Sequence, residues 1–116
     1  DYTNTFCFLM NEKFSDNEVY NDKNFLIWKK KWGSRLKLNN NNQEKYLKLM
    51  RSVNPLVIPR NHKVEEALAA ANDGNLEVLK KLLLVLKKPY HNQDNIINFQ
   101  SPAPLSNIDY KTYCGT

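Results

Sequence analysis

Glycine is scarce in this sequence of 116 residues, and its scarcity excludes the common nucleotide-binding loops. Gly33, Gly74 and Gly115 lie far apart, so neither a GxxxxGK[S/T] loop nor a GxGxxG loop is present. The two histidines, His62 and His91, have no second metal ligand at helical spacing. We therefore predict no nucleotide cradle, no metal site and no catalytic residue within these residues.

Cysteine and long apolar runs are also lacking. Cys7 and Cys114 lie at opposite ends without CxxC or zinc-type spacing, which predicts neither a disulfide scaffold nor a metal site and favours a reducing compartment. No apolar run approaches about 18 residues and no basic leader is visible, so we expect neither a membrane span nor a secretory signal. Because the chain starts at Asp1 without an initiator methionine, we interpret it as a piece of a longer protein.

Positive charge prevails, with 17 lysines and arginines against 12 aspartates and glutamates. An excess of cations attracts phosphate and so invites a nucleic-acid interpretation. The lysines, however, stand beside apolar positions, as in WKKKW and LVLKK, which is typical of the solvated faces of amphipathic helices. We therefore expect no nucleic-acid partner and keep a basic nucleic-acid binder as the weaker alternative.

The two tryptophans also bear on whether the chain binds nucleic acid. Trp28 and Trp32 lie beside Lys29–Lys31 and could stack on bases, as in single-strand binding surfaces. Their spacing puts both rings on one helical face with Phe25 and Leu36. We predict that this face packs in a core.

Apolar residues recur at helical spacing through the first 90 residues, which predicts an all-α fold. Helices are expected within residues 1–12, 25–38, 41–53, 61–73 and 75–88, as a small bundle of about four to five helices. Asn41, Asn61 and Asn75 are the expected N-caps. Gly33 is expected to mark either close packing or an early end of its helix.

The segment NPLVIPRN, residues 54–61, predicts a rigid extended connector. Pro55 and Pro59 lack backbone donors and restrict the residues before them, while Leu56–Ile58 need burial against neighbouring helices. Gly74 supplies the turn between the next two helices, which should pair as an antiparallel hairpin. The broad leucine and valine stripe of the second helix predicts burial on more than one side.

Beyond residue 90 the helical period is lost. Pro102 and Pro104 interrupt the segment, and its aromatic and branched residues are not typical of disorder. We predict a helical accessory domain over residues 1–90 and an irregular tail over residues 91–116 that lies along a surface.

Several blocks of the sequence, taken in order, resemble the C-terminal region of the SelO/YdiU family, kinase-fold proteins that act as protein adenylyltransferases. The blocks are DYTNTF, the W…W…RL spacing that ends at Leu36, YLKLMRSVNPLVIPRN, ALAAANDGN, LLLVLKKPY and a cysteine at the third-last position. The most specific is MRSVNPLVIPRNHKVEEAL, with its MRxVNPxxxxRN core. The resemblance covers essentially the whole chain.

The resemblance implies an upstream kinase-like domain that binds ATP in an inverted orientation with Mg²⁺ or Mn²⁺ and passes AMP to protein hydroxyls. No glycine-rich loop, phosphate-clamping residue, catalytic Asp or metal-binding pair of that domain matches here, so no catalytic position is carried over. Cys114 is carried over as a candidate redox thiol, because the family's C-terminal cysteine or selenocysteine is implicated in pairing with a catalytic-domain cysteine. Here the chain ends CGT where many relatives end CSS.

We therefore predict a non-catalytic helical domain that supports an upstream catalytic domain, whose partners are that domain and, for the full-length enzyme, its protein substrates. The alternative is a free-standing helical protein-interaction module. The expected compartment is the cytoplasm, or the mitochondrion if the source is eukaryotic.

Overall fold

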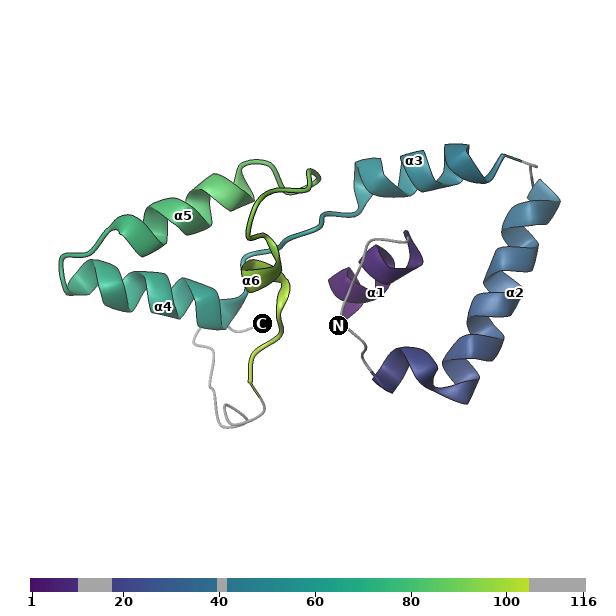
Figure 1. The fold of residues 1–116 in the computed structure, drawn as a ribbon, viewed down its shortest axis with the longest axis horizontal. Helices are drawn as coiled ribbons and strands as arrows, with labels where there is room; N and C mark the ends of the chain where they lie inside the picture. The colour runs from purple at the N-terminus through teal and green to yellow at the C-terminus, as the bar shows by residue number, and fades with distance from the viewer. Residues whose placement is uncertain (11–17, 40–41, 105–116) are drawn as a thin grey trace, which may run out of the picture. The chain divides into compact units, whose positions relative to one another are not determined.

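The computed structural model describes residues 1–10, 18–39 and 42–104, and every regular element in these ranges is helical. The predicted all-α class is therefore confirmed. The elements, in chain order, are α1 (Tyr2–Leu9), the 3₁₀ helix η1 (Glu18–Asn21), α2 (Lys23–Asn39), α3 (Gln43–Val53), α4 (Asn61–Asn72), α5 (Glu77–Leu86) and the short α6 (Ile97–Gln100), as Figure 1 shows.

The chain divides into two compact units. The first unit holds Tyr2–Asn54, and the second holds Asp1 together with the described residues from Pro55 onward. Residues 91–104 thus belong to the same unit as the hairpin that precedes them. The predicted domain boundary after residue 90 stays a prediction.

In the first unit, aromatic stacking joins α1, η1 and α2. The rings of Phe8 and Tyr20 stack with centroids 4.2 Å apart, and Phe25 of α2 lies 5.6 Å from Tyr20. Tyr20 is buried, as are Cys7 and Met10. Offset and tilted ring pairs of this kind add to the burial of apolar area, so they fix the start of α2 against η1.

Side-chain caps set where α2 and α3 begin. Asp22 accepts hydrogen bonds from the backbone N–H of Asn24 and of Phe25, at 2.8 and 3.0 Å. Asn42 accepts one from the N–H of Lys45 at 3.2 Å. Both satisfy donors that a helix start leaves without an intrahelical partner. Asn41, the expected cap of α3, lies outside the described residues.

Gly33 was expected to end its helix early or to mark close packing, and both expectations are wrong. The helix α2 continues to Asn39, and a Cβ added at Gly33 would meet no atom within 4 Å. The apolar stripe on either side of the glycine continues the helix in spite of its low propensity.

In the second unit, α4 and α5 contact each other as the predicted antiparallel hairpin (Figure 1). Gly74 has a φ of 84°, the left-handed conformation that ends many helices. Asn75, the expected N-cap of α5, is not its N-cap, because Leu76 occupies that position without a side-chain cap bond. Asn75 lies one residue earlier and accepts a hydrogen bond from the N–H of Glu77 at 3.0 Å. The buried residues of the pair include Ala67, Leu82 and Val85, and the small alanine permits close approach.

Asn61 is not the N-cap of α4, which corrects the prediction. Arg60 occupies the N-cap with extended backbone and no side-chain cap bond, and Asn61 is the first helical residue. Arg60 instead pairs with Asp1, at 2.6 Å between Nη1 and Oδ2. The extended conformation inherited from the connector, not the capping propensity of asparagine, sets the start of this helix.

The connector between α3 and α4 is extended, as predicted, and its Leu56 and Val57 are buried. The N–H of Leu56 donates to the carbonyl of Pro89 at 2.7 Å, and the carbonyl of Leu56 accepts from Nε2 of buried Gln100 at 2.7 Å. A buried peptide group must find partners, because an unsatisfied one costs roughly 1–3 kcal/mol. The two backbone groups of Leu56 therefore join the connector to the end of the hairpin and to α6.

The two glycines predict opposite effects on stability. Gly74→Ala should lower the free energy of unfolding by roughly 1 kcal/mol, because an L-residue is strained at a φ of 84°. Gly33→Ala, in open helical surroundings, should raise it by about 1 kcal/mol. Urea unfolding followed by circular dichroism measures both, and equal effects of the two substitutions would contradict the conformations described.

Candidate functional site

Of the two cysteines, only Cys7 lies in the described part of the chain. Cys7 is on α1 and is 0% exposed, so its thiol is shielded from reagents and partners. Cys114, the candidate redox thiol, lies outside the described residues.

Two carboxylates of the hairpin form ion pairs on their own helices. Glu66 pairs with Lys63 at 2.9 Å on α4, and Glu77 pairs with Lys80 at 3.0 Å on α5. Among the described residues, no three His, Cys, Asp or Glu side chains gather closely enough to hold a metal ion.

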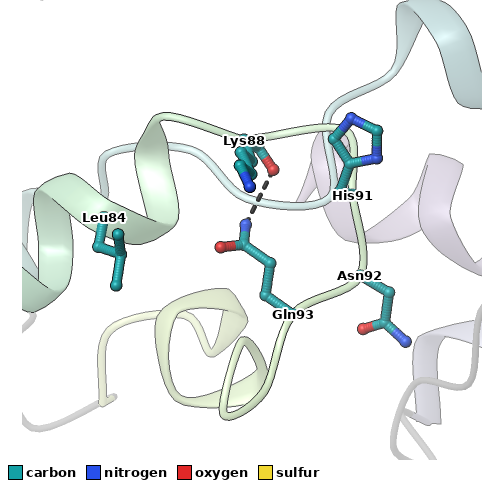
Figure 2. Close-up of a pocket in the computed structure, with 5 residues that line it drawn as sticks. All are labelled: Leu84, Lys88, His91, Asn92 and Gln93. Carbon is teal, nitrogen blue, oxygen red and sulfur yellow. Dashed lines mark hydrogen bonds between the residues drawn. The ribbon is translucent and has the colours of Figure 1, made fainter.

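An open pocket of about 540 Å³ lies at the C-terminal end of α5, lined by Leu84, Lys88, His91, Asn92 and Gln93. Figure 2 shows the amide of Gln93 turned toward the carbonyl of Lys88, to which its Nε2 donates at 2.8 Å. The same nitrogen donates to the carbonyl of Val85 at 3.0 Å. Both carbonyls also accept from backbone N–H groups, that of Val85 from Lys88 at 3.3 Å and that of Lys88 from His91 at 3.2 Å, so Gln93 adds a side-chain bond to each of them.

Leucines on α5 and at its N-cap are exposed, although the breadth of the apolar stripe predicted burial on more than one side. We define the leucine face as Leu76, at the N-cap, with Leu83 and Leu84 of α5, whose exposed fractions are 50%, 49% and 66%. Only Leu82 and Val85 of α5 are buried among the described residues. Covering a leucine side chain contributes about 1.5–3 kcal/mol, so an exposed set of this size is typical of an interaction surface.

The aromatic stripe of α2 is likewise not a core, which corrects the prediction made for Trp28 and Trp32. Trp28 is 45% exposed, and none of residues 23–38, the part of α2 whose burial is described, is buried. The two indoles stack on each other, with centroids 6.2 Å apart and planes 13° apart. Helical spacing correctly put them on one face, but in the described part of the chain only the end of that face, at Phe25, reaches the buried Tyr20.

Three further exposed apolar residues of α2 were missed from the sequence. Leu26, Ile27 and Leu38 are 48%, 47% and 86% exposed and lie off the aromatic stripe. The sequence does contain a signal for them, namely apolar residues on a second side of an otherwise basic helix. A helix with that pattern usually contacts more than one neighbour.

The charge on α2 is entirely positive. Its cations are Lys23, Lys29, Lys30, Lys31, Arg35 and Lys37, and it contains no aspartate or glutamate. Lys29 lies over the ring of Phe8, with its Nζ 4.4 Å from the centroid, a cation–π contact. None of the six forms an ion pair with another described residue.

His62 titrates in an unfavourable setting for its charged form. The side chain is partly buried on α4, and this burial lowers the pKa of His62 below its usual value near 6.5. Lys63 and Arg60 lower the pKa further, and Glu66 opposes them. The imidazole is therefore favoured in its neutral form.

The described helices include none that is both long enough and apolar enough to cross a bilayer.

Curated proteins of known sequence align with this chain from end to end. The chain is 50% identical over 116 residues to "Protein nucleotidyltransferase YdiU" of Pelagibacter ubique (strain HTCC1062). Proteins of the same name from Clostridium beijerinckii and Syntrophotalea carbinolica are 46% identical over 116 residues and 43% identical over 117. Each alignment covers 100% of this chain and 24% of the relative, so the chain spans about a quarter of their length. No family model and no solved structure matches the chain.

The lowered pKa of His62 predicts a loss of stability in mild acid. The unfolded chain takes up the proton at higher pH than the folded chain, so the free energy of unfolding should fall as pH drops below about 6.5 toward the lower folded pKa. Above that range the stabilisation is fully present. His62→Gln should remove this part of the pH dependence. Urea unfolding between pH 7.5 and 5.5 tests it, and an unchanged slope in the variant would contradict the assignment.

Proposed function

We propose that this chain, which is a C-terminal region of the SelO/YdiU family, is a non-catalytic helical support for a protein nucleotidyltransferase. The reaction proposed for the whole protein is transfer of AMP from ATP to protein hydroxyls. ATP, with Mg²⁺ or Mn²⁺, would bind in a kinase-like domain outside these residues. The basis is the relatives' name, nucleotidyltransferase, together with the 24% of their length that the chain spans.

The observation that carries the proposal is the leucine face. Leu76, Leu83 and Leu84 are about half exposed or more, although Leu76 and Leu83 belong to the broad apolar stripe of the sequence. About three quarters of each relative lies outside the aligned region, since the chain covers 24% of it. That remainder supplies the surface that covers the leucines, and their burial stabilises the joined protein.

A supporting domain must keep its own conformation, and the hydrogen bonds of the connector contribute to this. The N–H of Leu56 donates to Pro89 and the carbonyl of Leu56 accepts from Gln100, so the connector is bonded to the end of the hairpin and to α6. Pro55 and Pro59 add stiffness, because each fixes its own φ. The hairpin therefore presents its leucines on a rigid base.

Cys114 is the second part of the proposal. By family resemblance, its thiol forms a disulfide with a cysteine of the catalytic domain. The two thiols together lose two electrons and two protons, and a cellular oxidant accepts the electrons. Cys7 is a poor substitute because it is fully buried. The cytoplasm, or the mitochondrion in a eukaryote, stays the predicted compartment.

A free-standing interaction module remains the second candidate, because an exposed leucine face suits a separate protein as well as the same polypeptide. The two candidates differ in whether the leucines are covered within the longer protein itself. A basic nucleic-acid binder stays the weakest candidate.

Assays of the isolated 116-residue chain and of the whole P. ubique relative test the catalytic part. We expect the whole protein to transfer labelled AMP from ATP to a protein acceptor and the isolated chain neither to bind ATP nor to transfer AMP. Transfer by the isolated chain would overturn the proposal.

Leu83→Glu tests the supporting part. In the isolated chain the side chain is half exposed, so the unfolding temperature should change little. In the whole protein the same substitution should lower the free energy of unfolding by up to about 2 kcal/mol, because it places a charge in a covered site. Lys81→Glu, an exposed position on the same helix, is the matched control. Equal effects of Leu83→Glu in both proteins would show that the leucine face is not covered.

A further inference from the structure

We infer that α2 docks on a carboxylate-bearing surface in the part of the same polypeptide that lies outside these residues. The inference rests on the proposed function and gives it a second, electrostatic contact, distinct from the leucine face of α5. It is carried by the charge of α2, by the positions of its exposed apolar residues and by the share of the relatives that the chain spans.

The charge of α2 calls for an acidic partner. Its 17 residues hold six cations and no carboxylate, whereas α3, α4 and α5 each contain at least one glutamate. Like charges three or four residues apart, such as Lys31 and Arg35, destabilise an isolated helix. Aspartates or glutamates brought close by docking would offset this repulsion.

The apolar residues of α2 lie on two sides of the helix. Trp28 and Trp32 form one row, and their rings stack. Ile27 and Leu38 are eleven residues apart, which is three turns, so they share a second side on which Lys31 lies between them. Leu38 is 86% exposed and Ile27 is 47% exposed. A helix with apolar residues on more than one side is typically enclosed by protein.

This arrangement disfavours other polyanions. A helix that lies on a membrane surface separates one apolar face from one charged face, whereas lysines stand between the two apolar rows of α2. A single-stranded nucleic acid would use the stacked indoles but would leave Ile27 and Leu38 in water. A second copy of the chain would bring a net charge of +5 against another of the same sign.

We assign the acidic surface to the same polypeptide because the relatives are much longer than the aligned region. The aligned region covers 24% of each relative, so about three quarters of the protein is available to supply the acidic surface. A covalently joined surface meets α2 at a high effective concentration, so modest charge complementarity is enough to dock it.

Zero-length carbodiimide cross-linking of the whole P. ubique relative, read by mass spectrometry, tests the inference. The reagent joins a lysine amine to a carboxylate in contact with it. The comparison uses those positions at which the relative also has a lysine. We expect lysines aligned with Lys30 and Lys31 to link to Asp or Glu outside the aligned region. Their yield should be several times that of lysines aligned with Lys45 and Lys48 of α3. Links from α2 that stay within the aligned region, or equal yields from both helices, would overturn the inference.

Charge reversal in the whole protein carrying this sequence as its C-terminal region gives a second readout. Lys30→Glu with Lys31→Glu should lower the unfolding temperature more than Lys45→Glu with Lys48→Glu, and the difference should shrink in about 1 M NaCl because salt screens exposed charges. Equal effects of the two pairs would contradict docking. Binding of the whole protein to poly(U) or to phosphatidylserine vesicles, abolished by the α2 pair alone, would assign α2 to a different partner. Neither readout depends on AMP transfer, so failure here is distinct from failure of the proposed function.

Discussion

The main physical constraint on this structure is that large apolar side chains on α2 and α5 stay in contact with water. Small units bury a limited share of their surface, and each of the two units here is small. The first unit closes around Tyr20 and Cys7, and the second around the Leu56 connector and the inner side of the hairpin. The residues that the structure describes leave Trp28 and Leu38 on α2, and Leu83 on α5, 45% exposed or more.

Several polar side chains of the described residues serve the helices and the connector. Asp22 caps a helix start, Glu66 and Glu77 form surface ion pairs, and the buried Gln100 donates to the carbonyl of Leu56. The exposed apolar and cationic side chains are where interaction energy is available. The proposed supporting role in a longer protein would use those side chains.

Local chemistry allowed much of the fold to be predicted from the sequence. Pro55 and Pro59 indicated the extended connector, and Gly74 indicated the turn of the hairpin, because each of these residues restricts the backbone by itself. Asn75 was expected to be the N-cap of α5, but Leu76 occupies that position. Asn61 was assigned wrongly, since the extended backbone at Arg60 decided the helix start. The cap at Asp22 was missed.

The candidate surfaces were harder to predict, for a physical reason. Periodicity shows that Trp28 and Trp32 share a face, but a face that packs in a core and a face that awaits another domain have the same spacing. The breadth of the α5 stripe was recognised, yet the partner for Leu83 and Leu84 is not among the described residues. The family resemblance was recognisable because the MRxVNPxxxxRN block combines helix end, connector and helix start in one short stretch.

Hydrogen–deuterium exchange tests the central claim most directly, namely that the exposed faces of this region are covered in the longer protein. The amides of α2 and α5 would be compared between the whole relative and the isolated chain, with the amides of α3 as an internal reference. The account predicts markedly slower exchange in α2 and α5 of the whole protein, because covered helices open less often. Equal exchange in the two proteins would contradict it.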